Sequence, residues 1–297
     1  MKPASWPCAV SVVIPALNEG DYLRRTVEQV RATLPPRGEI IVVDDGSADG
    51  CCDFLRASPG GVRLLEPSAE RLGVSGARNK GAAAAGGEVV VFLDGHVDMQ
   101  PGWLEKLCAA ARDPRVGAVG PGIAVMGRPD CCGWGMRYRD AALGIEWLPP
   151  PDGDAPGVAM VAGACIAIRR DLFERIGGFD EGLLRWGSED AELSLRLWMA
   201  GYEQRVVADV TIDHLFRERH PYAVDWAGIL YNQLRVAFVH FTQERIRRVI
   251  ERMKPYGDFA AACALLAESD TTLRRDEVHA RRSRDDDAYF ARFGDIH

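Results

Sequence analysis

Short apolar runs alternate with segments of helical periodicity along the first part of the chain. Between the first two runs, Leu23, Val27, Val30 and Leu34 recur at helical spacing. Each run is four or five residues long, which is the length of a buried strand. The runs cover residues 10–14, 40–43, 62–65 and 89–93. Strands that alternate with helices predict βαβ units and an α/β fold, with a mainly parallel mixed sheet and helices on both faces.

The pattern changes after the fourth run. Residues 120–157 are rich in Gly and Pro and carry aromatic residues such as Trp147, which favours an irregular loop that binds the acceptor, with an ill-ordered segment as the alternative. Regular structure is expected again as a strand at 160–168, a helix at about 188–200 and a last strand at 205–212.

Residues 1–222 are therefore predicted to form one α/β domain, and residues 223–297 a helical C-terminal extension. Trp226, Leu230 and Leu234 begin an apolar stripe in this extension. Such a stripe has to be buried, so we expect the extension either to pack on the domain or to lie at a homodimer interface.

Composition and charge exclude several classes of function. The formal net charge of −7 over 297 residues disfavours a nucleic-acid partner, which requires a concentrated basic face. No apolar run approaches the roughly 18 residues that span a bilayer. Residues 1–9 lack the extended apolar core of a secretory signal, and none of the eight cysteines forms a Cys-x-x-Cys pair. These features favour a cytoplasmic protein without a transmembrane segment.

Acidic and imidazole side chains follow two of the predicted strands at the point where each strand ends. Asp94, Gly95 and His96 come directly after the fourth apolar run. Asp44 and Asp45 come directly after the second. Ligands of open α/β sheets bind at the carboxyl ends of the strands, which favours a ligand site at this edge. Because an Asp-Gly pair is also common in turns, a purely structural role is the alternative.

A histidine after the last predicted strand completes a candidate metal site. His214 follows that strand as Asp94 and His96 follow the fourth run. Two imidazoles and one carboxylate, together with diphosphate oxygens, suit an octahedral Mn²⁺ ion. Mg²⁺ prefers oxygen ligands and is the alternative ion. Arg217, three residues further on, is placed to neutralise a leaving diphosphate.

Two predicted helix starts carry further candidate residues. Arg78 lies among small residues at a helix start whose backbone amides suit a phosphate or a nucleoside. Ser188 is expected to cap a second helix, which places Glu189 and Asp190 in its first turn. A carboxylate there can act as a general base, and a favourable interaction with the helix dipole is the alternative explanation. Trp186 would supply a flat apolar wall for a sugar.

Several of these segments resemble the family 2 glycosyltransferases of the GT-A fold. The matching segments are residues 13–19, 42–47 and 76–81. A closer resemblance is to the catalytic domain of the polypeptide N-acetylgalactosaminyltransferases, in which an Asp-x-His motif is followed by Gly-Trp-Leu-Glu. The corresponding motifs here are Asp94-Gly95-His96 and Gly102-Trp103-Leu104-Glu105. That family's Trp-Gly-Gly-Glu-Asn and His-Val-Phe-Arg correspond to Trp186-Gly187-Ser188-Glu189-Asp190 and His214-Leu215-Phe216-Arg217.

The resemblance covers roughly residues 9–222 and implies roles for individual residues. Asp94, His96 and His214 would bind Mn²⁺, and Asp45 and Arg78 would face the uridine. Arg217 and the loop with Tyr222 would close over the donor. The other residues expected to contact the nucleotide sugar are Pro15, Asn18, Glu19, Asp44, Gly95 and Trp186.

The departures from the family's pattern complete the prediction. Asp190 stands where those retaining enzymes have Asn, and an Asp after Glu is similar to the general base of inverting GT-A enzymes. We therefore expect a metal-dependent transferase that moves a sugar from a UDP-sugar (GalNAc, GlcNAc, Gal or Glc) to an acceptor hydroxyl with inversion, with Asp190 as base beside Glu189. Because no membrane anchor is visible, we expect a cytoplasmic enzyme rather than a Golgi-type one.

Three alternatives remain open at this point. A retaining transferase of the polypeptide N-acetylgalactosaminyltransferase type needs no protein base and would conserve the anomeric configuration. A sugar nucleotidyltransferase would release pyrophosphate from a nucleoside triphosphate, although the Gly-rich, Lys-bearing start motif of that class is absent from the sequence. A catalytically inactive domain would bind a nucleotide sugar without turnover.

Overall fold

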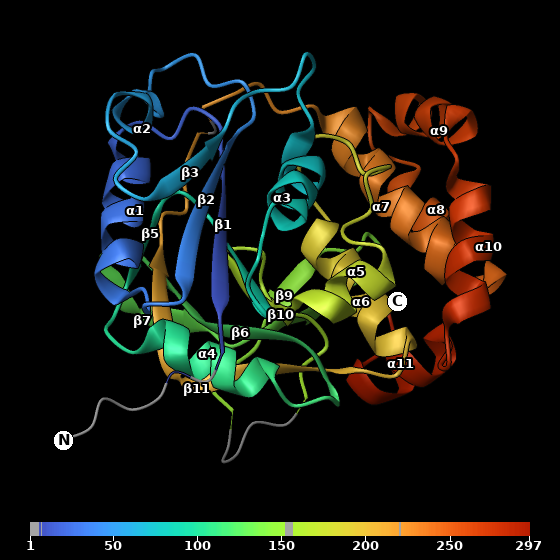
Figure 1. Ribbon diagram of the computed structural model, residues 1–297. Helices are drawn as coiled ribbons and strands as arrows, with labels where there is room; N and C mark the ends of the chain where they lie inside the picture. Colours follow the sequence, from blue (N-terminus) through green and yellow to red (C-terminus); the bar gives the residue numbers. More distant parts are fainter. Residues whose placement is uncertain (1–5, 7, 152–156, 220) are drawn as a thin grey trace.

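The computed structural model, which describes residues 6, 8–151, 157–219 and 221–297, is built around one nine-stranded mixed sheet (Figure 1). Across the sheet, the strands are β3 (Val62–Leu65), β2 (Gly38–Asp44), β1 (Val10–Ala16), β4 (Val89–Leu93), β10 (Cys165–Arg169), β6 (Val116–Val125), β11 (Glu203–His214) and β5 (Val97–Met99). The ninth strand, β7 (Arg128–Gly133), pairs with β6. A separate hairpin consists of β8 (Met136–Tyr138) and β9 (Ile145–Trp147).

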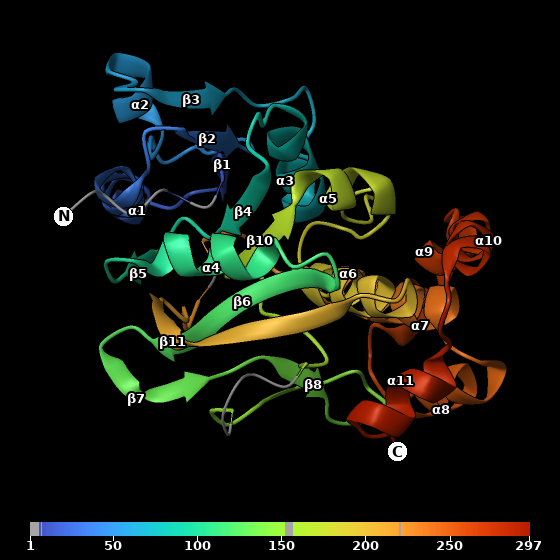
Figure 2. The same cartoon turned by 60° about the horizontal axis from the view of Figure 1, so that its bottom comes forward.

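The first four strands form the parallel, doubly covered part of the sheet. Helix α1 (Asp21–Thr33) covers one face and α3 (Gly73–Ala83) the other, and the short α2 (Asp53–Ala57) precedes β3 (Figures 1 and 2). Along β1, Val12 packs in the same core as α1, whereas Val13 packs with α3. This alternation follows from the two-residue period of a strand and confirms the α/β fold with helices on both faces.

The second half of the sheet reverses direction at β10, which pairs antiparallel with both β4 and β6. Helix α4 (Trp103–Ala111) packs beside β6, and β11 runs parallel to β6 and antiparallel to β5. The helices α5 (Arg170–Ile176) and α6 (Glu189–Met199) bury apolar residues in the core that also contains α3.

The prediction that residues 120–157 form an irregular loop is wrong, because the end of β6 and the strands β7, β8 and β9 lie within this segment. Its glycines make room for aromatic rings. A Cβ on Gly122 would lie 2.8 Å from the Trp134 ring, and a Cβ on Gly133 would lie 2.5 Å from Trp147. Residues 152–156 of the expected loop lie outside the described part of the chain.

Two further local predictions need correction. The strand expected at 160–168 begins only at Cys165, and Met160 forms an isolated bridge with Met136 instead. Ser188 precedes α6 with a left-handed φ of 71°, and its side chain makes no capping hydrogen bond within the described residues. The helix start is set by neighbouring segments rather than by a local cap.

The C-terminal part is helical, as expected. It consists of α7 (Trp226–His240), α8 (Gln243–Met253), α9 (Phe259–Glu268), α10 (Thr271–Arg281) and α11 (Asp286–Phe293). These helices lie together beside α6 (Figures 1 and 2). Trp198 of α6 packs edge-on against Tyr289 of α11, with ring centroids 5.4 Å apart. The extension thus packs on the sheet domain, whereas its boundary at residue 222 and a homodimer stay predictions.

A buried ionic cluster joins α6 to α7. The Glu192 carboxylate accepts hydrogen bonds of 2.7 and 2.9 Å from Arg196 and lies 3.1 Å from His240 Nε2. Burial opposes ionisation of Glu192, but the charge of Arg196 and the hydrogen bond with His240 outweigh it and hold the pKa of Glu192 well below its usual range.

Replacing Glu192 with Gln should lower the free energy of unfolding by about 3 kcal/mol at pH 7, because Arg196 would be left buried without its counter-ion. The pKa of Glu192 is depressed in the folded chain, so its stabilisation is present above the unfolded value of 4.5 and is lost as the pH falls below it. Urea unfolding at several pH values should therefore show the gap between wild type and variant narrowing below pH 4.5.

The matched control is Glu174→Gln, which removes an exposed partner of Arg170 and should change stability by less than about 1 kcal/mol. A gap between wild type and Glu192→Gln that widens toward low pH would contradict the account.

Candidate active site

A cavity of about 550 Å³ opens at the carboxyl ends of β1, β2 and β4. Within the described residues, its lining includes every predicted site residue except Asn18 and Asp44. Those that line it are Pro15, Glu19, Asp45, Arg78, Asp94, Gly95, His96, Trp186, Glu189, Asp190, His214, Arg217 and Tyr222. Segments far apart in the sequence therefore meet where the strand ends predicted a ligand site.

The three predicted metal ligands come together in this cavity. One potential ligand atom from each of Asp94, His96 and His214 lies within 4.8 Å of the others. Asp94 and His96 lie in the short turn between β4 and β5, and His214 is the last residue of β11. The antiparallel register that pairs His214 with Val97 of β5 places the second imidazole beside the first, with ring centroids 4.8 Å apart.

The chemistry of this cluster fits a divalent cation. His96 Nδ1 lies 2.8 Å from the Glu19 carboxylate, which leaves Nε2 of that ring for a metal. His214 Nε2 lies 3.3 Å from Asp94 Oδ2. Burial opposes ionisation of Asp94, but the hydrogen bond with His214 and the charge of Arg78 outweigh it and lower the pKa of Asp94. The carboxylate is therefore ionised at neutral pH, as a metal ligand must be.

Arg78 links three segments that line the cavity. Its side chain is 2% exposed, and it donates to Asp94 Oδ1 at 3.0 Å, to Glu189 Oε1 at 3.0 Å and to the carbonyl oxygen of Gly163 at 2.8 Å. Fully buried charges need such partners, and the two carboxylates keep the pKa of Arg78 raised against the effect of burial. Both terminal nitrogens of the guanidinium thus donate to protein acceptors, and the expected contact of Arg78 with uridine stays a prediction.

Glu189 is buried and Asp190 half-buried, and all four of their carboxylate oxygens have protein donors. Glu189 Oε2 accepts from the Gly187 backbone at 3.1 Å. The two oxygens of Asp190 accept from the backbones of Gly163 and Ala191, each at 2.8 Å. Burial raises the pKa of Glu189 and of Asp190, and the charge of Asp190 raises that of Glu189 further. This pair holds the start of α6 against the Gly163 turn.

The acidic pair after β2 shapes the loops around the cavity. Asp44 is buried, is paired with Arg56 at 2.8 Å and accepts from the backbone of Ser47, so it stabilises its own turn. Asp45 accepts from the backbones of Leu72 and Gly73 at 2.6 and 3.1 Å, which fixes the segment that leads into α3. Burial raises the pKa of Asp45.

Asn18 and Glu19 likewise hold neighbouring parts of the cavity wall. Asn18 has a left-handed φ of 54°, and its side-chain oxygen accepts from the Ala48 backbone at 2.8 Å. Glu19 accepts from Arg217 at 2.5 Å in addition to its contact with His96. Arg217 is thereby held at the metal cluster.

The structure adds functional candidates that the sequence analysis missed. Arg71 lies 3.6 Å from Asp45 and stacks over the Tyr222 ring at 5.9 Å, yet a lone Arg in a loop gives no sequence signal. Burial raises the pKa of Tyr222 to about 12. Met136 and Ile145 line the cavity from the β8–β9 hairpin, where no regular structure was expected.

Two family descriptions match the chain. Residues 11–177 match Glycosyl transferase family 2, and residues 156–221 match the N-terminal domain of galactosyltransferase. The first match covers more than half of the 297 residues, and the chain belongs to glycosyl transferase family 2.

Individual relatives confirm the resemblance that the motifs indicated. The chain is 35% identical over 240 residues to polypeptide N-acetylgalactosaminyltransferase 13 of Rattus norvegicus, which covers 71% of this chain and 42% of the relative. It is 30% identical over 271 residues to the probable polypeptide N-acetylgalactosaminyltransferase 8 of Homo sapiens, which covers 82% of this chain and 42% of the relative. This chain thus spans less than half the length of these curated relatives.

A solved structure confirms the GT-A fold. The crystal structure of GalNAc-T7 with UDP, GalNAc and Mn²⁺ superposes with a TM-score of 0.79 and 22% identity. The superposition covers 97% of this chain and 57% of GalNAc-T7. At this identity the match supports the fold alone.

The expected cytoplasmic localisation is wrong. The polypeptide N-acetylgalactosaminyltransferases that the chain matches are enzymes of the Golgi lumen. The expectation rested on the lack of a spanning apolar run, on the cysteine pattern and on the start of the sequence, and that start carries no information about targeting when the chain spans 42% of its relatives. Residues 1–5 and 7 of that stretch also lie outside the described residues. Among the residues described, no helix is long and apolar enough to cross a membrane.

Arg78→Met should lower the free energy of unfolding by about 3 kcal/mol, because it leaves the half-buried Asp94 and the buried Glu189 without their shared cation. Arg71→Met is the matched control, since Arg71 lines the same cavity with 37% of its side chain exposed and should cost less than about 1 kcal/mol. Urea unfolding of both variants measures the difference. Equal losses would show that the buried Arg78 network does not organise the site.

Proposed function

We propose that this chain is a Mn²⁺-dependent glycosyltransferase that moves a sugar from a UDP-sugar to an acceptor hydroxyl. GalNAc is the sugar that we propose. The observation that carries the proposal is the cluster of Asp94, His96 and His214 in the cavity at the carboxyl edge of the sheet. The donor is inferred from the relatives, which are named polypeptide N-acetylgalactosaminyltransferases, and from the UDP, GalNAc and Mn²⁺ in the GalNAc-T7 structure. A polypeptide is the acceptor that those names suggest.

Asp94, His96 and His214 would hold the Mn²⁺ ion, which when bound neutralises the charge that develops on a departing diphosphate. Glu19 fixes the tautomer of His96 by accepting from its Nδ1, and it also anchors Arg217. Arg217 lines the same cavity, where its charge would interact with the diphosphate.

The stereochemical part of the proposal is transfer with retention. The inversion expected from Asp190 is not confirmed, and the retaining alternative fits the relatives better. Asp190 also has a structural role that does not require it to act as a base, because its two oxygens accept from the backbones of Gly163 and Ala191 and so position the Gly163 turn.

Removal of a metal ligand tests the proposed site. Asp94→Ala and His214→Ala should each weaken Mn²⁺-dependent UDP binding at least about tenfold, as measured by calorimetric titration of UDP in Mn²⁺ and again in EDTA. Asp209→Ala, which removes an exposed partner of Lys106, is the control and should leave binding unchanged. UDP binding that is equally strong in EDTA would contradict the metal site.

The role of Asp190 is tested with Asp190→Asn and the product of the wild-type enzyme. Loss of a general base lowers turnover by about 10²–10⁴-fold, whereas a positioning role predicts a smaller loss. The product should keep the anomeric configuration of the UDP-sugar when read by NMR. An inverted product together with an inactive Asp190→Asn variant would restore Asp190 as the base.

A further inference from the structure

The turn between α5 and α6 carries part of the cavity wall in a strained conformation. Arg185, Gly187 and Ser188 all have left-handed backbones, with φ values of 48°, 102° and 71°. Two of these three are not glycine, so the surrounding structure has to hold them there. Trp186 and Gly187 line the cavity, and Glu189 follows at the start of α6. What holds this turn therefore also positions the cavity wall.

One side chain of the C-terminal extension forms hydrogen bonds with several backbone groups of this turn. The Asn232 side-chain oxygen of α7 accepts from the Leu184 backbone at 2.7 Å. Its amide nitrogen donates to the carbonyl oxygens of Leu184, Trp186 and Gly187 at 2.9, 3.1 and 3.0 Å. Asn232 is completely buried. Only a side chain with one acceptor and a donating amide group matches this set of backbone atoms.

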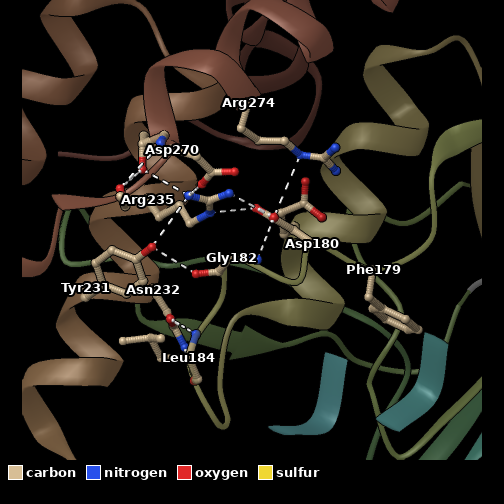
Figure 3. A network of polar contacts seen from close by, with 12 residues as sticks. Phe179, Asp180, Gly182, Leu184, Tyr231, Asn232, Arg235, Asp270 and Arg274 are labelled. Carbon is tan, nitrogen blue, oxygen red and sulfur yellow. Dashed lines mark hydrogen bonds and ion pairs between the residues drawn. The ribbon is translucent and has the colours of Figure 1, made fainter. Parts of the chain in front are cut away.

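The residues beside Asn232 on α7 hold the start of the same turn (Figure 3). Arg235 donates to both oxygens of Asp180, at 2.8 and 3.0 Å, and Tyr231 donates to the carbonyl oxygen of Gly182 at 2.9 Å. The guanidinium of Arg235 lies so close over Gly182 that it occupies the space of a Cβ. Arg235 also donates to Asp270 at 2.6 Å, which ties α7 to the start of α10. A buried bidentate pair of this kind fixes both distance and orientation.

The opposite side of the turn rests on the start of α3. The Val74 backbone donates to the carbonyl oxygen of Arg185 at 2.8 Å. The turn is thus clamped between α3 of the sheet domain and α7 of the extension. Neither clamp involves a residue that the metal cluster uses.

We propose that Asn232 is a positioning residue of the transferase, which acts by holding Trp186 and Gly187 against the sugar-binding part of the cavity. This inference rests on the proposed function and adds a role for the C-terminal extension. Within the described residues, the side-chain hydrogen bonds of Asn232 go to the turn and not to the metal cluster, so its loss should impair positioning of the sugar while the metal cluster still binds UDP.

The test is Asn232→Asp in the full chain, with Val239→Ala as a matched control. Asp has the shape of Asn and keeps the acceptor for Leu184, but it turns an oxygen toward three carbonyl oxygens. Val239 is buried two turns further along α7, so its truncation reports on loss of packing in the same helix. Hydrogen exchange of the peptide covering 180–190, calorimetric UDP titration in Mn²⁺, and turnover of UDP-GalNAc are measured for each.

Asn232→Asp should exchange faster in 180–190 and lose about tenfold or more in turnover, with UDP affinity close to that of wild type. Val239→Ala should lower thermal stability without faster exchange in this peptide. Unchanged exchange in Asn232→Asp overturns the inference, whether or not the wild-type chain turns over a UDP-sugar. Fast exchange with normal turnover overturns it as well.

If wild type binds no UDP, the proposed function fails, and the exchange data still decide whether Asn232 holds the turn. If Asn232→Asp does not fold, Asn232→Ser removes the same amide donors without adding a charge, and faster exchange over 180–190 is again expected. No rise in that variant would overturn the inference.

Discussion

The buried guanidinium of Arg78 is the interaction on which the rest of the site depends. It joins Asp94 at the end of β4, Glu189 at the start of α6 and the carbonyl oxygen of Gly163 before β10. A buried guanidinium needs acceptors that compensate its charge, and that charge in turn lowers the pKa of Asp94 and opposes the burial that raises the pKa of Glu189. The metal ligand and the acidic helix start are therefore parts of one charged unit, and the geometry of one constrains the other.

The antiparallel second half of the sheet and the C-terminal helices supply the remaining parts of the site. β11 and β5 run side by side, and this pairing places His214 next to His96. The helix α7 then fixes the strained turn before α6 from outside. The extension thus contributes to the cavity wall as well as to the hydrophobic core. This shared dependence explains why residues from all parts of the sequence meet at one edge of the sheet.

The sequence was sufficient to predict the α/β fold and the Asp94, His96 and His214 cluster, because strand periodicity and strand ends are local features. It was misleading where contacts between segments far apart in the sequence determine the local structure. The glycines of β6 and β7 suggested a loop, whereas they accommodate Trp134 and Trp147. Arg78 was expected to face the nucleotide, whereas its carboxylate partners are Asp94, 16 residues away, and Glu189, 111 residues away in sequence. No local pattern identifies Asn232, whose partners belong to a turn more than forty residues earlier.

The most direct test of the central claim is a crystal of this chain soaked with Mn²⁺ and UDP, with diffraction measured on both sides of the manganese absorption edge. The account predicts one strong anomalous peak in the cavity, coordinated by Asp94, His96 and His214, with the UDP diphosphate completing its ligands. Arg78 should keep its contacts with Asp94 and Glu189 in that complex. A manganese peak elsewhere, or UDP bound in the cavity with no metal beside these three side chains, would contradict the account.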